Sequence, residues 1–304
     1  GVEAVISSVV PPSGALLIVV NGAYGRRMVQ IADRLRIVHT VLEYPEDRTP
    51  EPAAVEDALA QNHSITHVAI VHCETTSGII NPVADVCRRA HRRGCVTMVD
   101  AMSSFGAYPI SVADWEIDFL VSSANKCIEG VPGFAFVVAR KSALAACEGY
   151  ARSLCLDLVA QWKGLENDGQ FRFTPPTHAM LAFHAALLEL EAEGGVSARA
   201  ARYQANYATT LAGMEQLGFV PMLRPEDRGY IITSFHYLSH PNFVFKTFYE
   251  QLGQRGYMIY PGKMSQADCF RIGHIGRIDQ SDIRGLLAAM REVLANMGVT
   301  TQTI

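Results

Sequence analysis

The chain has 304 residues, of which 49% are hydrophobic and 18% charged, and its formal net charge is −4. This length and apolar content suffice for one large and one smaller domain. Binding to a nucleic-acid backbone needs clustered positive charge, which the acidic balance argues against. No run approaches the ~18 apolar residues of a membrane span, and no signal-peptide pattern is present, so we expect neither nucleic-acid nor membrane partners.

Cysteine usage points to a reducing compartment. The seven cysteines are odd in number and show no framework spacing, which predicts reduced thiols in a cytoplasmic protein. Cys87, His91 and Cys95 are spaced by four, as metal ligands on one helix would be. Gly94 is expected to end that helix first, so we predict no metal site.

The chain opens GVEAVISSVV, without an initiator Met and without a strand before a helical stretch. We therefore expect residues upstream of this point. A strand at 15–20 follows, closed by Asn21-Gly22, and a helix then begins near Tyr24. Tyr24 thus lies at a strand-to-helix edge, where its ring could stack on a ligand or be half-buried against the sheet.

The next elements alternate as strand and helix, which is typical of a parallel sheet: strands at 37–42 and 67–72, with a helix at 52–61. The hydroxyl-rich segment HCETTSG follows the second of these strands. It predicts either ligand hydrogen bonds or an ST-turn that leads into the next helix. We expect Glu74 to orient this loop and His72 to be a buried histidine rather than a catalyst.

Two further strands each deliver a reactive group. The apolar run 96–99 ends on Asp100, and the run 119–123 leads to Lys126, with glycines and a proline forcing a turn beyond it. Parallel strands would bring this carboxylate and amine to the same edge of the sheet. Pyridoxal phosphate needs such a pair, since a lysine amine links to its aldehyde and a carboxylate faces its ring nitrogen. Alternatively, Asp100 caps a turn and Lys126 is solvated.

The second half of the chain predicts a smaller domain. The helical stretch 196–217 is expected to lead into short strands at 219–223, 230–235, 257–260 and 270–272, with helices at 243–253 and 280–297. This pattern predicts a large domain over residues 1–197 and an α+β domain over 198–304.

Arg271 is the candidate anion-binding residue of the smaller domain. It lies between Phe270 and Ile272, with glycines at 273 and 276 leaving room beside it. Its guanidinium could clamp a carboxylate or phosphonate at two points, or form a structural ion pair. Pro261, Gly262 and Lys263 are expected to form a loop over the same site.

Five strings resemble class V aminotransferases, in order over essentially the whole chain. They are NGAYGRRM (21–28), HCETTSGIINP (72–82), VDAMSSFG (99–106), SSANKCIEGVPGFAF (122–136) and CFRIGHIG (269–276). The lysine loop is most similar to the branch that moves the amino group of 2-aminoethylphosphonate to pyruvate, a reaction of phosphonate catabolism.

The resemblance implies a pyridoxal-phosphate fold of type I, with a mostly parallel sheet of the seven-stranded type and a smaller α+β domain. It implies that Lys126 and Asp100 are catalytic and that Arg271 binds both acidic substrates. It also implies cofactor contacts from Tyr24, Thr75, Asp100, Met102, Asn125, Lys126 and Thr174. A Gly/Ser/Thr loop that binds the cofactor phosphate would precede the first helix of this chain.

The resemblance also implies a homodimer with shared active sites. The loop at 171–177 cannot be helical through its prolines. In the family such a loop crosses to the partner, where Thr174 would contact the neighbour's cofactor phosphate. Otherwise it is an ordinary helix start, with Thr177 preceding an apolar helical face.

Three alternatives remain open at this point. The first is another aminotransferase of the class, acting on alanine with glyoxylate or on serine with pyruvate. The second is a pyridoxal-phosphate lyase or desulfurase in which Cys127, next to Lys126, would attack the substrate. The third is a non-catalytic scaffold, which would fold and dimerise without taking up the cofactor.

Overall fold

The apolar run Ala15–Val20 forms β1, an inner strand of a six-stranded sheet with the order β2-β1-β3-β6-β7-β8. Our computed structural model describes residues 1–262 and 268–299. Neighbouring strands are parallel from β2 to β7, and β8 pairs antiparallel with β7. The remaining strands of this sheet are β2 (Val38–Glu43), β3 (Ile65–Val71), β6 (Val96–Asp100), β7 (Phe119–Ser123) and β8 (Ala135–Ala139).

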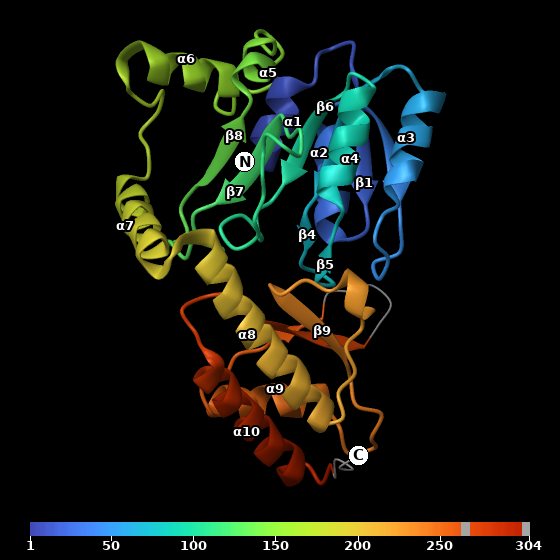
Figure 1. The fold of residues 1–304 in the computed structure, drawn as a ribbon, viewed down its shortest axis with the longest axis vertical. Helices are drawn as coiled ribbons and strands as arrows, with labels where there is room; N and C mark the ends of the chain where they lie inside the picture. Colours follow the sequence, from blue (N-terminus) through green and yellow to red (C-terminus); the bar gives the residue numbers. More distant parts are fainter. Residues whose placement is uncertain (263–267, 300–304) are drawn as a thin grey trace.

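Helices cover both faces of this sheet, which explains why β1 is apolar throughout (Figure 1). Leu16 and Ile18 pack into one core with residues of α1, α2, α5 and α6. Leu17 and Val19 point to the opposite face and pack against α3 and α4. The helices are α1 (Val2–Val9), α2 (Ala23–Arg34), α3 (Pro52–Gln61), α4 (Val83–Arg92), α5 (Lys141–Ala145) and α6 (Leu158–Asp168).

A second, three-stranded sheet of order β10-β11-β9 lies in the lower lobe of Figure 1. Helix α8 connects the two lobes as one continuous helix. The core of this lobe is aromatic, with Phe219, Phe235, Phe248 and Phe270 fully buried. Its elements are α8 (Gly195–Gln216), η1 (Pro225–Asp227), β9 (Ile232–His236), α9 (Phe245–Gln254), β10 (Tyr260–Pro261), β11 (Cys269–Gly273) and α10 (Gln280–Asn296), and α7 (Thr177–Glu193) precedes them.

The α/β fold with a mostly parallel sheet confirms the sequence prediction, and six strands form this sheet where the seven-stranded type was expected. The predicted strand at 219–223 is wrong. This segment contributes only an isolated bridge between Pro221 and Phe235, flanked by hydrogen bonds from the N–H of Met222 to Ser234 and from the N–H of His236 to Val220, because the chain bends at residues 222–223. A short hairpin that the sequence did not predict joins β4 (Cys73–Glu74) to β5 (Ile79–Ile80).

The helix that carries Cys87 and His91 ends before Cys95, as the sequence predicted from Gly94. Helix α4 stops at Arg92, and Gly94 adopts a left-handed conformation with φ of 72°. Within the described part of the chain, no group of three His, Cys, Asp or Glu side chains could hold a metal ion. Over residues 1–262 and 268–299, no helix has the length and apolar character needed to cross a bilayer.

Candidate active site

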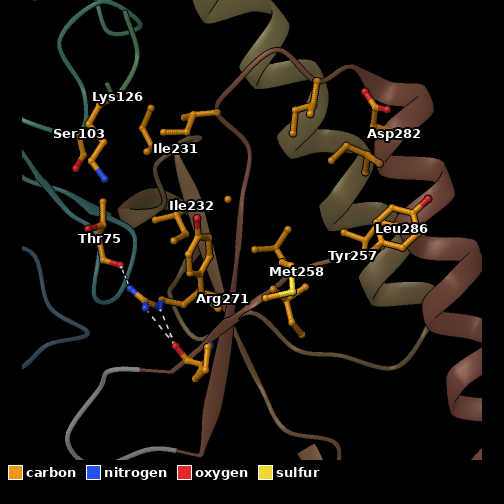
Figure 2. Close-up of a pocket in the computed structure, with 18 of the residues that line it drawn as sticks. Thr75, Ser103, Lys126, Ile231, Ile232, Tyr257, Met258, Arg271, Asp282 and Leu286 are labelled. Atoms are coloured by element: carbon orange, nitrogen blue, oxygen red, sulfur yellow. Dashed lines mark hydrogen bonds between the residues drawn. The ribbon is translucent and has the colours of Figure 1, made fainter. Parts of the chain in front are cut away.

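A pocket of about 760 Å³ lies between the two lobes. Thr75, Ser103 and Lys126 line it from loops at the carboxyl ends of the large sheet, and Tyr24 lines it from the first turn of α2. Arg271 reaches toward them from β11 (Figure 2). The structure therefore brings together four of the residues that the sequence singled out, although they are separated by up to 247 positions.

Lys126 is presented by a tight turn after β7. The N–H of Gly130 donates to the carbonyl of Ala124 at 2.8 Å, and the N–H of Glu129 donates to the carbonyl of Lys126 at 2.9 Å. A Cβ at Gly130 would lie 2.8 Å from the oxygen of Ala124, so the turn requires glycine there. No carboxylate of the described residues pairs with the amine of Lys126, which leaves it available for chemistry.

Asp100 ends β6 and is 7% exposed. Its Oδ1 accepts the N–H of Met102 at 2.9 Å, while its Oδ2 accepts no hydrogen bond from the described residues. Burial raises the pKa of this carboxyl, and the hydrogen bond from Met102 opposes that change. Asp100 lines a smaller cavity under α1 rather than the large pocket, so it lies deeper than Lys126. A buried acid with a free oxygen suits a protonated ring nitrogen as its partner.

Glu74 organises the edge of the pocket that carries Tyr24. Its carboxylate accepts the N–H groups of Tyr24 and Gly25 at 3.1 and 3.3 Å, at the start of α2. Its other oxygen accepts the hydroxyl of Thr76 at 2.8 Å. Glu74 is fully buried, and burial raises its pKa. A Cβ at Gly22 would lie 2.3 Å from the Glu74 side chain, so this close contact requires a glycine there.

Arg271 is a buried cation without a counter-charge. It is 6% exposed, and its guanidinium donates to the carbonyls of Thr75 at 2.8 Å and of Pro261 at 3.2 and 3.3 Å. Among the described residues no carboxylate forms an ion pair with it, and burial lowers its pKa. Carbonyl dipoles only partly offset the loss of hydration, so the site favours an anion from solution.

The other predicted cofactor residues lie further from this pocket. Met102 and Asn125 flank Asp100 and Lys126 in the chain but do not line it. Thr174 lies in an exposed loop between α6 and α7 and does not reach the pocket of its own chain. Lys263 falls outside the described residues.

Ser103 is a lining residue that the sequence analysis missed, although it follows Asp100 by only three positions in the string VDAMSSFG. The pair SS offered a signal, because hydroxyl side chains after a strand end commonly bind ligands. His72 is buried and hydrogen-bonded to Ser104, and burial lowers its pKa to about 4, which agrees with a non-catalytic histidine.

These residues fit pyridoxal phosphate. The free amine of Lys126 matches the cofactor aldehyde, and the buried Asp100 matches its ring nitrogen. The ring of Tyr24 lies in the pocket wall, where it can stack on a planar group.

Comparisons with known proteins agree with this chemistry. The family described as Aminotransferase class-V matches residues 2–266. The chain is 52% identical over 294 residues to a 2-aminoethylphosphonate--pyruvate transaminase of Vibrio vulnificus (strain CMCP6), covering 96% of this chain and 80% of that protein. A protein of the same name from Salmonella typhimurium is 51% identical over the same shares.

Solved structures share the fold. A pyridoxamine-pyruvate aminotransferase from Mesorhizobium loti superposes with a TM-score of 0.89 at 25% identity, covering 100% of this chain and 78% of that one. A ureidoglycine-glyoxylate aminotransferase from Bacillus subtilis also gives 0.89, at 21% identity, covering 99% and 79%.

Proposed function

The chain belongs to the class V aminotransferase family, and on this basis we propose that it transfers the amino group of 2-aminoethylphosphonate to pyruvate. The products are phosphonoacetaldehyde and L-alanine, and the reaction serves phosphonate catabolism. The observation that carries the substrate class is Arg271, a buried cation that pairs with no carboxylate of the described residues and faces the same pocket as Lys126. The relatives that match over 96% of the chain carry this activity in their names.

Pyridoxal phosphate is the cofactor of this family, and it supplies an aldehyde that links to amines and a ring that takes up the electrons of a breaking C–H bond. We assign its attachment to the amine of Lys126 and the partner of its ring nitrogen to Asp100. Tyr24 would stack on the ring, and Thr75, Met102 and Asn125 would help to hold the cofactor.

Lys126 also moves the proton in this proposal. With the cofactor bound, the Nζ of Lys126 would be the base that takes the proton from the substrate carbon that bears nitrogen. The turn held by Gly130 keeps this amine at the pocket. The carboxylate of Asp100 would hold the ring nitrogen in its protonated form.

Arg271 serves both half-reactions. Its guanidinium first holds the phosphonate of 2-aminoethylphosphonate, and after phosphonoacetaldehyde leaves, it holds the carboxylate of pyruvate. The nitrogen is conserved in the exchange, because the amine of one substrate becomes the amine of alanine while the oxygen of pyruvate leaves as water. Sharing one cation between two acids predicts ping-pong kinetics.

We further propose a homodimer that completes each site. The face around α7 exposes large apolar side chains, with Leu181 71%, Leu188 53% and Phe173 50% exposed. A second copy packed on this face would cover them and bring the neighbouring Thr174 to a cofactor phosphate.

The domain limits and the location of the protein are also proposals. We divide the chain into a cofactor domain over 1–197 and a smaller domain over 198–304, although α8 runs without interruption through this limit. We place the protein in the cytoplasm, since all seven cysteines are free and six of them are buried.

The visible spectrum tests the proposed function directly. Protein loaded with pyridoxal phosphate should lose its absorbance band on addition of 2-aminoethylphosphonate faster than with alanine or serine, and pyruvate should restore the band. If only alanine or serine discharges the band, the protein is another aminotransferase of the class. Failure to form any band would contradict the assigned cofactor role of Lys126.

The desulfurase alternative has no support in the geometry. Cys127 is fully buried, and its thiol donates to the carbonyl of Ser103 at 3.2 Å. Burial raises its pKa, so it is not a ready nucleophile. Sustained sulfide release from cysteine would overturn this conclusion.

A further inference from the structure

One face of α8 contacts the turn that presents Lys126. Arg199, Arg202 and Tyr203 are spaced by three and four positions, so their side chains share that face. Arg199 donates to the carbonyl of Cys127 at 2.6 Å and lies 3.5 Å from the carboxylate of Glu129. Arg202 donates to the same carboxylate at 3.0 Å, and the hydroxyl of Tyr203 donates to it as well.

The same face also contacts the segment that follows β11. Arg202 donates to the carbonyl of Gly276, and the hydroxyl of Tyr203 accepts the N–H of Gly276 at 3.2 Å. Arg271 lies on β11, five residues before Gly276. The turn of Lys126 and the strand of Arg271 are therefore bound to one helix by the same two side chains.

The contacts centre on one buried arginine and are balanced in charge. Arg199 is 2% exposed, Arg202, Glu129 and Glu193 are partly buried, and the two carboxylates take up the charges of the two arginines. Breaking a charge network around a buried arginine costs more than forming it contributes, so such a network fixes geometry rather than adding much stability. A charged cavity of about 490 Å³ adjoins it and shares Ile278 and Asp282 with the lining of the Lys126 pocket.

Glu129 adds backbone strain to this arrangement. Its φ of 64° lies in the left-handed region, which a residue with a side chain adopts only at an energetic cost. The hydrogen bonds to its carboxylate hold this conformation, and the N–H of Glu129 closes the turn on Lys126. Loss of those bonds would release the turn.

We propose that Arg199, Arg202 and Tyr203 are positioning residues that fix the Lys126 turn relative to the strand of Arg271. None of the three lines the pocket, so they act on the reaction only through the turn and the strand. The inference rests on the proposed roles of Lys126 and Arg271. In this proposal α8 sets the distance between the amine of Lys126 and the guanidinium of Arg271.

Amide hydrogen exchange by mass spectrometry on the cofactor-loaded protein tests the contact itself, apart from activity. Two variants are compared: Tyr203→Phe, which removes one hydroxyl and keeps the ring, and Arg199→Lys, which keeps the charge. Arg277→Gln is the matched control, because Arg277 lines the same charged cavity, its side chain is 82% exposed, and within residues 1–262 and 268–299 it forms an ion pair with Glu189 alone.

We expect exchange of the Glu129 and Gly130 amides to rise about tenfold in both variants and to stay unchanged in the control. At a temperature where every variant is fully folded, kcat should fall and KM for pyruvate should rise, because amine and cation are then misplaced.

Unchanged exchange in Tyr203→Phe, with kcat and KM as in the unmodified protein, would overturn the proposal and leave the network with a purely structural role. If Arg199→Lys fails to fold, Tyr203→Phe decides alone. If exchange rises as expected but the protein shows no transamination, the positioning contact stands and the proposed function fails.

Discussion

Replacing Arg271 with glutamine is the most direct perturbation of substrate binding. Arg271 is 6% exposed, and its guanidinium contacts backbone carbonyls and the ring of Tyr260 but no carboxylate among the described residues, so its charge is available to a substrate anion. Glutamine can still donate one hydrogen bond to the carbonyl of Thr75 or Pro261, and therefore keeps part of the local structure.

The expected loss follows from the hydrogen bonds that the anion would lose. A two-point contact contributes two charge-assisted hydrogen bonds of about 1.5–3 kcal/mol each. Their sum of about 3–6 kcal/mol corresponds to a decrease in kcat/KM of roughly 10²- to 10⁴-fold. Arg271→Lys keeps the charge without the planar fork, so we expect a smaller loss of roughly 10- to 100-fold.

Single-turnover absorbance measurements with each substrate form the assay. The loss for 2-aminoethylphosphonate should match the loss for pyruvate, because one cation serves both. Ethylamine, which lacks the phosphonate, should react with Arg271→Gln as slowly as with the unmodified protein. A loss confined to one half-reaction, or an equal loss with ethylamine, would refute the reasoning. Arg277→Gln controls for the change in net charge.

Three further changes probe other parts of the molecule. Asp100→Asn should lower kcat by roughly 10²- to 10⁴-fold, because it removes the carboxylate proposed to pair with the ring nitrogen of the cofactor. Absorbance measures cofactor binding in the same samples. Gly130→Ala should lower the free energy of unfolding by about 1–3 kcal/mol in a urea titration, since the new Cβ would lie 2.8 Å from the oxygen of Ala124. Gly253→Ala is the control: its Cβ would have no atom nearer than 3.9 Å, so this change should not destabilise the protein. Burial lowers the pKa of His274 to about 3, so this residue is neutral when folded and takes up a proton on unfolding below about pH 6.5. Stability should therefore fall from pH 7.5 to pH 5, and His274→Gln should flatten this fall by about 2 kcal/mol; equal slopes would contradict the assignment.

The large sheet and its reactive edge could be predicted from the sequence because their signals are local. Asp100 and Lys126 each follow an apolar run, and parallel strands must bring their ends together. The role of Glu74 in holding Tyr24 was less accessible, since 50 positions separate the two and the bond forms only when α2 packs beside β4. Strand periodicity was also misleading at 219–223, because the chain bends at residues 222–223 and pairs with β9 through one bridge.

The contacts between α8 and the Lys126 turn could not be predicted, for a different reason. Arg199 and Arg202 lie in a helix with polar residues on several faces, so periodicity does not distinguish buried arginines from solvated ones. Only the folded chain shows that Arg199 is 2% exposed and bonded to Cys127, 72 positions away. The proposed role of Thr174 likewise depends on a second copy of the chain, which one sequence does not describe.

The junction between α7 and α8 has a mechanical consequence. Gly194 and Gly195 are consecutive left-handed residues, with φ of 111° and 76°, and α8 then runs for 22 residues without a break. A helix of this length is about 33 Å long, so a rotation of 10° about the two glycines would displace its far end by roughly 6 Å. The second sheet would move with that end as a rigid body. The contacts of Arg199, Arg202 and Tyr203 with the Lys126 turn oppose such a rotation, so these contacts and the two glycines together determine the angle between the lobes.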